Sequence, residues 1–141
     1  MIFALYTDGG ARGNPGPAAW GFVIYQDNKL VAQGSGYLGH TTNNVAEFTA
    51  CIEGLKYISD TGGIGHTINC FADSQLLIEQ LNGRYKVKAP HLKPLIAEIH
   101  QLSCPHIVSY QHIRREKNKE ADKLVNETLD RKQNTNLHSA L

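Results

Sequence analysis

The alternation of apolar and polar positions predicts that the chain begins with strands. Residues 2–8 and 18–26 are short, mainly apolar runs with turn-forming residues after them, a pattern typical of strands. Residues 9–17, which are rich in Gly, Pro and Asn, are expected to form a loop. A hairpin turn at residues 27–29 leads to a third predicted strand, from residue 30 to about residue 37. We therefore expect an antiparallel meander.

From Asn44 onward the spacing of apolar residues becomes helical. They recur at steps of three and four residues: Val45, Phe48, Ile52, Leu55 and Ile58. This amphipathic helix is expected to end at Gly62 and Gly63.

The second half of the chain alternates strands with helices. The pattern predicts a strand at residues 67–72, a short helix at 74–81, a helix at 91–102, a strand at 106–113 and a last helix at 118–131. The order is three strands, a helix, a strand, two helices, a strand and a helix. It indicates an α/β fold with a mixed sheet and helices packed on its faces.

Length and charge narrow the class of protein. A chain of 141 residues with 41% hydrophobic content can bury one core but is short for two domains, so we expect one domain at residues 1–132 and a flexible tail at residues 133–141. Without a long apolar run or a signal-peptide pattern, a soluble cytoplasmic protein is expected. A formal net charge of +1 leaves any nucleic-acid binding to local patches.

The three cysteines suggest neither a disulfide framework nor a metal site. Cys51, Cys70 and Cys104 are widely spaced, odd in number and set among apolar residues. We expect all three to be buried, reduced thiols.

Four carboxylates lie at the edges of predicted elements. Asp8 and Asp73 end strands, Glu47 lies in the first turns of a helix, and Asp122 opens the last helix. If the first and fourth strands are neighbours, Asp8 and Asp73 meet at one edge of the sheet. Clustered carboxylates need a compensating cation, and oxygen ligands suit Mg²⁺ or Mn²⁺. Taken singly, each could instead be a turn residue, a helix cap or a solvated charge.

Several motifs that contain these carboxylates resemble those of the type 1 ribonuclease H family, in the family's order. They are Thr7-Asp8-Gly9-Gly10 with Gly13-Asn14-Pro15-Gly16-Pro17-Ala18-Ala19, then Thr42-Asn43-Asn44-Val45-Ala46-Glu47, Ala72-Asp73-Ser74-Gln75, and Asn118-Lys119-Glu120-Ala121-Asp122. The resemblance spans nearly the whole domain and implies a ribonuclease H-like fold with a five-stranded mixed sheet.

The resemblance also implies an activity. It is that of a metal-dependent endonuclease that cuts the RNA strand of an RNA/DNA hybrid and leaves 5′-phosphate and 3′-hydroxyl ends. Two Mg²⁺ or Mn²⁺ ions during catalysis would be held by four catalytic carboxylates, with Asp8 as the expected bridging ligand: Asp8, Glu47, Asp73 and Asp122.

Longer members of the family carry a histidine in a loop before the last acidic motif, and this chain departs from that pattern. Residues 113–118 form a shorter segment here, and His112 is expected in the preceding strand. Arg115 and Glu116 are the candidates for an auxiliary role in place of that histidine. A solvated charge cluster is the alternative.

The resemblance places six residues where they would read the 2′-hydroxyl groups in the minor groove: Gly9, Gly10, Asn14, Asn43, Asn44 and Gln75. Thr42 matches a position at a pocket for a DNA-strand phosphate. Lys86 and Lys88 lie in residues 84–90, which stand where many members have a long basic protrusion, and are candidates for phosphate contacts. Asn14 and Asn43 could instead be turn residues, and residues 84–90 could equally be a plain solvated loop.

Two further hypotheses stay open. One is a catalytically silent nucleic-acid-binding domain with the same fold, although such a binder would not need clustered carboxylates. The other is an enzyme that also cuts double-stranded RNA. We expect a monomer with no membrane partner.

Overall fold

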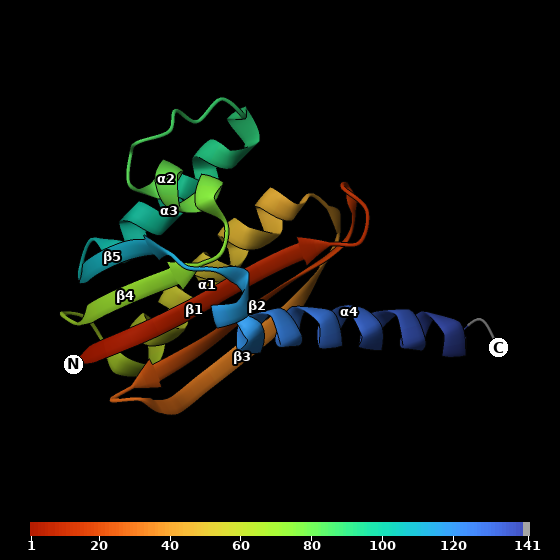
Figure 1. Ribbon diagram of the computed structural model, residues 1–141, viewed down its shortest axis with the longest axis horizontal. Helices are drawn as coiled ribbons and strands as arrows, with labels where there is room; N and C mark the ends of the chain where they lie inside the picture. Colours follow the sequence, from red (N-terminus) through yellow and green to blue (C-terminus); the bar gives the residue numbers. More distant parts are fainter. Residues whose placement is uncertain (140–141) are drawn as a thin grey trace.

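The computed structural model describes the backbone of residues 1–139 and the side chains of residues 1–132 (Figure 1). The elements follow the predicted order: β1 (Ile2–Ala11), β2 (Gly16–Gln26), β3 (Lys29–Thr41), α1 (Asn43–Gly62), β4 (Thr67–Ala72), α2 (Gln75–Leu81), the 3₁₀ turn η1 (Pro90–Leu92), α3 (Lys93–Ser103), β5 (Ile107–His112), the 3₁₀ turn η2 (Arg115–Lys117) and α4 (Lys119–Ser139).

The five strands form one mixed sheet in the order β3-β2-β1-β4-β5. β1, β2 and β3 pair antiparallel, as the predicted meander requires, while β1–β4 and β4–β5 pair parallel. The register pairs Thr7 with Ala72. Asp8 in β1 and Asp73, the first residue after β4, follow this pair directly, and the parallel pairing of β1 with β4 confirms the predicted adjacency of these strands.

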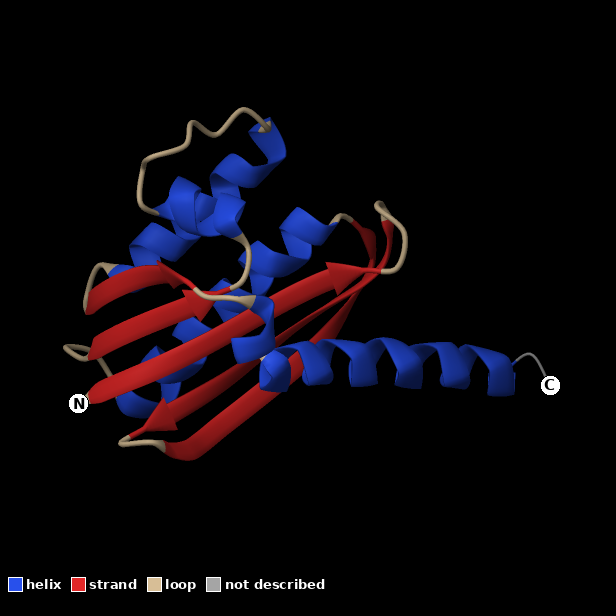
Figure 2. Cartoon of the chain, viewed as in Figure 1, coloured by secondary structure: helices blue, strands red, loops and turns tan. Residues whose placement is uncertain are grey.

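Helices cover the sheet on two sides (Figures 1 and 2). Successive residues of a strand point to opposite faces of the sheet, so the side chains of β2 alternate between the two faces. Phe22 and Ile24 belong to the large core shared with α1, α2 and α3, whereas Ala19 packs with Val125 and Leu129 of α4. α1 and α4 therefore lie on opposite faces, and each approaches β1 from its own side.

The predicted loop at residues 9–17 is wrong over most of its length. β1 continues to Ala11 and β2 begins at Gly16, so Gly9 and Gly10 pair with Trp20 and Ala19 inside the sheet. Glycine usually signals a loop, but here it permits close packing: a Cβ on Gly9 would lie 2.3 Å from the carbonyl carbon of Ala46 in α1. Asp8 consequently lies within β1 and not at its end.

The last helix is longer than its apolar stripe predicted. α4 runs to Ser139 instead of ending at Arg131 (Figure 1). Residues 132–139 contain neither Gly nor Pro, so nothing in the backbone chemistry ends the helix where the apolar residues stop. Part of the predicted tail, residues 133–139, is thus helical, and residues 140–141 lie outside the described range.

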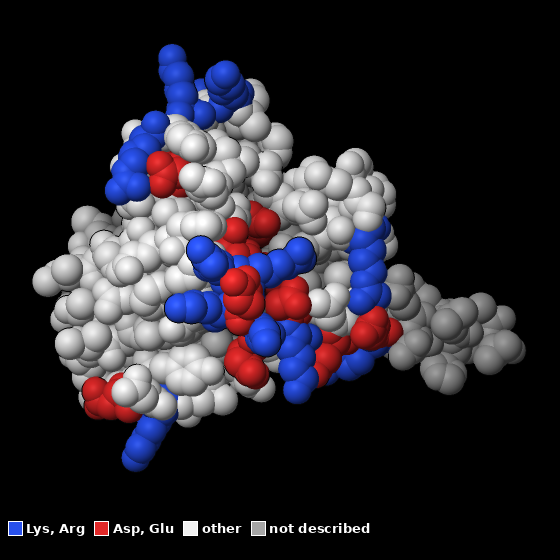
Figure 3. Space-filling view, in the orientation of Figure 1, with Lys and Arg blue, Asp and Glu red and all other residues white. Residues whose placement is uncertain are grey.

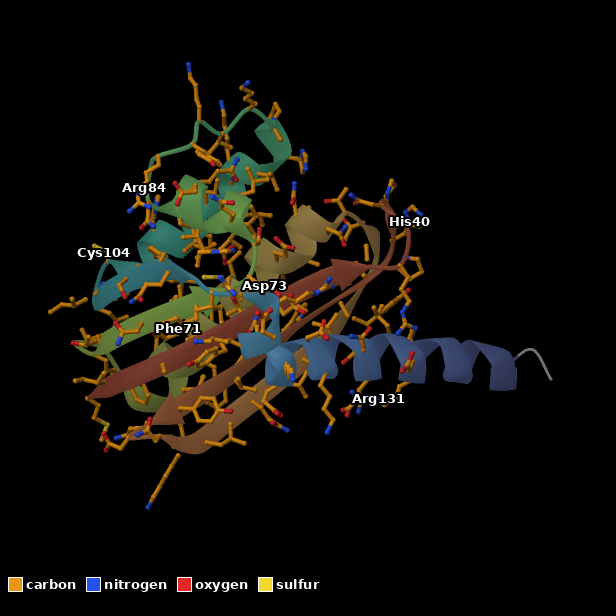
Figure 4. The ribbon with its side chains drawn as sticks, viewed as in Figure 1. His40, Phe71, Asp73, Arg84, Cys104 and Arg131 are labelled. Atoms are coloured by element: carbon orange, nitrogen blue, oxygen red, sulfur yellow. The ribbon has the colours of Figure 1, made fainter. Side chains whose placement is uncertain are left out.

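The cysteine prediction is correct for two residues. All three thiols are free, and Cys51 and Cys70 are buried, but Cys104 is exposed at the end of α3 (Figure 4). Cys104 lies where α3 turns towards β5, outside the apolar stripe of the helix.

Within the described residues, no helix is long and apolar enough to cross a membrane.

Candidate active site

Four carboxylates from separate parts of the chain line one cavity of about 490 Å³: Asp8 of β1, Glu47 of α1, Asp73 directly after β4, and Asp122 of α4. In Figure 3, Asp and Glu side chains gather near the middle of this face with Lys and Arg among them. Figure 4 shows Asp73 in the same central region, whereas Arg84 and His40 lie towards the periphery. The fold thus brings together the four residues that the motifs singled out.

Two glycines let the helices that carry Glu47 and Asp122 approach the sheet. At Gly9, a Cβ would fall 2.4 Å from the backbone nitrogen of Glu47 itself. At Gly21 of β2, a Cβ would lie 3.0 Å from the carbonyl oxygen of Ala121, the neighbour of Asp122. The sequence pattern gave no signal for Gly21, because its partner helix lies about a hundred residues further along the chain.

Burial and mutual repulsion raise the pKa of two carboxylates in this cavity, Asp8 and Glu47. Burial, with the nearby charges of Asp73, Asp122 and Glu47, raises the pKa of Asp8 to about 8. Burial also raises the pKa of Glu47 to about 7, with Asp73 adding to the effect and a hydrogen bond from Ser74 opposing it. Asp8 therefore interacts with all three of the other carboxylates and is the centre of the cluster.

The donor chemistry of this cavity fits a hard divalent cation. All four acidic side chains offer oxygen ligands, and a cation among them would offset the cost that raises the pKa of Asp8. Within residues 1–132, no three His, Cys, Asp or Glu side chains already converge as a ligand set. The four carboxylates therefore line a common cavity, but their side chains are not already arranged as a set of metal ligands.

Three of the six predicted groove-reading residues line the carboxylate cavity: Gly9, Gly10 and Asn43. Asn43 Oδ1 accepts a hydrogen bond from Ala11 N at 2.6 Å, and Asn14 Oδ1 accepts one from Asn43 N at 3.1 Å. These bonds hold the start of α1 against the β1–β2 turn. Among the described residues, no hydrogen bond engages the amide nitrogen of either side chain.

Thr42 and Gln75 have local positions at helix starts. Thr42 caps α1, its Oγ1 accepting from Val45 N at 3.3 Å, and Gln75 is the exposed first residue of α2. Neither lines the carboxylate cavity.

A second cavity, of about 540 Å³, collects the predicted basic contacts. Asn44, Lys86 and Lys88 line it together with Arg84 and Tyr85. In Figure 3, Lys and Arg side chains stand out at the margin of the molecule above α2 and α3. Asn44 thus faces away from its neighbour Asn43, which separates two residues that the motif had grouped.

The two auxiliary candidates lie on different sides of η2. Arg115 lines the carboxylate cavity, whereas Glu116 lines a separate hollow with Tyr6 and Tyr25. His112 is exposed at the end of β5 and lines neither. The sequence pattern also missed Arg12 on the cavity wall, whose guanidinium binds Asp130 of α4 at 2.7 Å.

The fold and this site define a class of protein. A five-stranded mixed sheet with an acidic cavity across β1, β4, α1 and α4 is the architecture of a ribonuclease H-like domain. A family model described as reverse transcriptase-like matches residues 6–128. The structure of LC11-RNase H1 in complex with an RNA/DNA hybrid is 41% identical, with a TM-score of 0.88 over 93% of this chain and 99% of that one. The chain belongs to the ribonuclease H family, type 1.

Curated relatives agree with this assignment. Ribonuclease HI of Halobacterium salinarum is 39% identical over 89% of this chain and 63% of its own length. Bifunctional protein Rv2228c of Mycobacterium tuberculosis is 35% identical over 92% of this chain and 36% of its own length. The chain thus spans about a third of the length of the mycobacterial relatives it matches.

Proposed function

We propose that this protein is an endoribonuclease that hydrolyses the RNA strand of RNA/DNA hybrids and leaves 5′-phosphate and 3′-hydroxyl ends. One observation carries the proposal: four carboxylates from separate parts of the chain line a single cavity of about 490 Å³. A relative of 41% identity binds an RNA/DNA hybrid, which supports this choice of substrate.

In this proposal Asp8, Glu47, Asp73 and Asp122 hold two Mg²⁺ or Mn²⁺ ions. When bound, such ions activate the attacking water and stabilise the charge that develops on the departing 3′ oxygen. Asp8 would be the central residue of this ligand set, because it interacts with each of the other three carboxylates. Arg115, which lines the same cavity, is placed to attract the phosphate. Glu116 faces another hollow, which argues against a direct role for it.

RNA would be distinguished from DNA at the rim formed by β1 and the start of α1. Gly9 and Gly10 permit close approach of the minor groove, and the amide nitrogens of Asn14 and Asn43 can donate to 2′-hydroxyl groups. Gln75, at the start of α2, would also read the minor groove, and Thr42, at the start of α1, would contact a phosphate of the DNA strand. Lys86 and Lys88, with Asn44, would bind backbone phosphates at the second cavity.

The alternative of a silent nucleic-acid-binding domain is less well supported. A binder gains nothing from a carboxyl group whose pKa is raised to about 8 by burial and by its neighbours. Double-stranded RNA is a second candidate substrate, since it also presents 2′-hydroxyl groups in a wide minor groove. Three free thiols support a reducing, cytoplasmic location, and we propose that the protein acts there as a monomer.

A substrate panel tests the proposal. Hybrids labelled on either the RNA or the DNA strand, duplex RNA and duplex DNA are incubated with the protein and Mg²⁺ or Mn²⁺, and the product ends are mapped. We expect cuts in the RNA strand alone, with 5′-phosphate ends. Cutting of both hybrid strands, or of duplex DNA at a similar rate, would contradict the proposed specificity, and the duplex-RNA arm decides the breadth of the activity.

A further inference from the structure

Asn118 is a polar residue buried deep in the molecule. It lies between η2 and α4, and its exposed fraction is 1%. Burial of an amide costs free energy unless the amide is hydrogen-bonded. Asn118 makes one such bond: its Nδ2 donates to the carbonyl oxygen of Thr7 in β1 at 2.8 Å, across 111 positions of sequence.

The side chain of Asn118 does not act as an ordinary helix cap. Asn directly before a helix usually accepts hydrogen bonds from the first backbone N–H groups through its side-chain oxygen. Here Oδ1 is buried and has no hydrogen-bond partner among the described residues. The amide therefore serves the strand beside it instead of its own helix.

This bond joins the two chain segments that carry Asp8 and Asp122. Thr7 precedes Asp8 directly, and the backbone carbonyl of Asn118 accepts from the backbone nitrogen of Asp122 at 3.1 Å. The side chain of Asn118 thus holds the peptide group that precedes Asp8, and its backbone carbonyl holds the helical turn that carries Asp122. The close approach of α4 to Gly21 leaves little room for the helix to shift elsewhere.

We propose that Asn118 is a positioning residue for catalysis, which sets the spacing of Asp8 and Asp122 by tying the start of α4 to β1. It touches neither substrate nor ion and acts through the two carboxylates. This inference rests on the proposed function, because it assigns the spacing to the binding of divalent ions.

The test removes the tie while leaving helix capping possible. Asn118→Ser is too short to reach Thr7 but leaves a side chain that can cap α4, and Asn118→Ala removes the bond to Thr7 and offers no capping group. Thr128→Val is the matched control, because Thr128 Oγ1 donates to Ser35 Oγ at 2.9 Å and also ties α4 to the sheet, outside the carboxylate cavity. For each variant, kcat and KM on the hybrid are measured well below its melting temperature. The Mn²⁺ concentration that gives half-maximal thermal stabilisation is measured without nucleic acid.

We expect both Asn118 variants to lose about tenfold in kcat, with KM little changed, and to need about tenfold more Mn²⁺, as is usual when a residue that orients metal ligands is removed. Thr128→Val should lose stability but keep both values. If Asn118→Ser melts earlier yet keeps kcat and the Mn²⁺ midpoint, the inference is overturned while the proposed function stands. If the wild type is stabilised by Mn²⁺ but cuts no hybrid, the proposed function fails, and the Mn²⁺ midpoints alone still decide the role of Asn118.

Discussion

At the scale of single residues, the site is built from groups that are unfavourable where they stand. Asp8 is nearly buried and faces three other carboxylates, which raises its pKa to about 8. The motifs predicted that Asp8, Glu47, Asp73 and Asp122 would act together, because their order matches a family pattern. What the pattern could not predict is Gly21 or Asn118, since their partners are distant in sequence and no local periodicity links them.

The raised pKa of Asp8 makes stability depend on pH. Between its ordinary value near 4 and about 8, the folded state binds more protons than the unfolded state, so the free energy of unfolding falls as pH rises through this range. Without divalent ions, Asp8→Asn should therefore melt several degrees higher than the wild type at pH 8 and show little difference near pH 4. Thermal melts in EDTA across this range measure the effect. Asp60→Asn, an exposed change at the far end of α1, is the control. An unchanged or lowered melting temperature of Asp8→Asn at pH 8 would contradict the account.

Gly9 and Gly10 offer a matched pair for the packing of α1. A Cβ on Gly9 would lie 2.3–2.5 Å from backbone atoms of Ala46 and Glu47, whereas one on Gly10 would make an ordinary 3.7 Å contact with Val125. We expect Gly9→Ala to cost about 3 kcal/mol in urea denaturation and to displace Glu47. Gly10→Ala should stay within about 1 kcal/mol of the wild type. Equal stabilities of the two variants would show that α1 can retreat from β1 without cost.

At the scale of elements, most of the fold was predictable, and the exceptions lie where local composition does not decide the structure. The order of strands and helices followed from the hydrophobic period. The structure adds the caps at two helix starts, Thr42 for α1 and Ser74 for α2. The errors at residues 9–17 and 132–139 arose where tertiary packing or plain backbone chemistry overrides local composition. Glycines extend β1 and β2, and polar residues continue α4, because neither the sheet nor the helix needs an apolar side chain at those positions.

Three elements are joined at the end of the sheet opposite the carboxylates. His106 Nε2 lies 2.9 Å from Ser59 Oγ of α1, and its Nδ1 accepts a hydrogen bond from His66 N at 3.2 Å, which places the ring proton on Nε2 in the neutral form. The rings of His66 and His106 stack with centroids 5.7 Å apart. Protonation of His106 at Nδ1 would break the bond from His66 N.

This junction should be sensitive to acid. Burial and the neighbouring His66 lower the pKa of His106 below its ordinary 6.5, so in mild acid the unfolded state binds more protons and the free energy of unfolding falls as pH drops below about 6.5. His106→Gln should reduce this loss between pH 7 and 5, as measured by denaturant unfolding at each pH. His40→Gln, at an exposed position on β3 (Figure 4), should leave it unchanged. An identical pH slope in wild type and His106→Gln would exclude this role.

At the scale of the whole molecule, the proposed function requires a nearly neutral protein to bind a polyanion through few contacts. The net charge is +1, and the basic side chains at the second cavity are Arg84, Lys86 and Lys88. Arg84 is paired with Glu79 at 3.0 Å, so the two lysines are the main candidates there for phosphate contacts. The motifs singled out the four carboxylates that line the first cavity. They did not indicate that Asn44 and these lysines line a common cavity, because that depends on how α1 and residues 84–90 are arranged in space.

Salt dependence measures the contribution of these lysines. If Lys86 and Lys88 each neutralise one phosphate, the slope of log binding constant against log salt should become less steep by about 2 in the double variant Lys86→Ala/Lys88→Ala. Binding of a labelled hybrid, followed by fluorescence anisotropy with Ca²⁺ in place of Mg²⁺ at several salt concentrations, measures the slope. Lys29→Ala, at the β2–β3 hairpin, is the control of equal charge type. An unchanged slope would mean that residues 84–90 form a solvated loop that does not contact the hybrid.

The most direct test of the account is single-turnover cleavage of an RNA/DNA hybrid by the wild type and Asp8→Asn, in Mg²⁺ and in EDTA, with hybrid binding measured in parallel. We expect the wild type to cut the RNA strand only in Mg²⁺, and Asp8→Asn to bind the hybrid but to cut no faster than the enzyme-free control, because Asp8 is the centre of the carboxylate cluster. A wild type that binds the hybrid but leaves it intact in both Mg²⁺ and Mn²⁺, or an Asp8→Asn variant that cuts as fast as the wild type, would contradict the account.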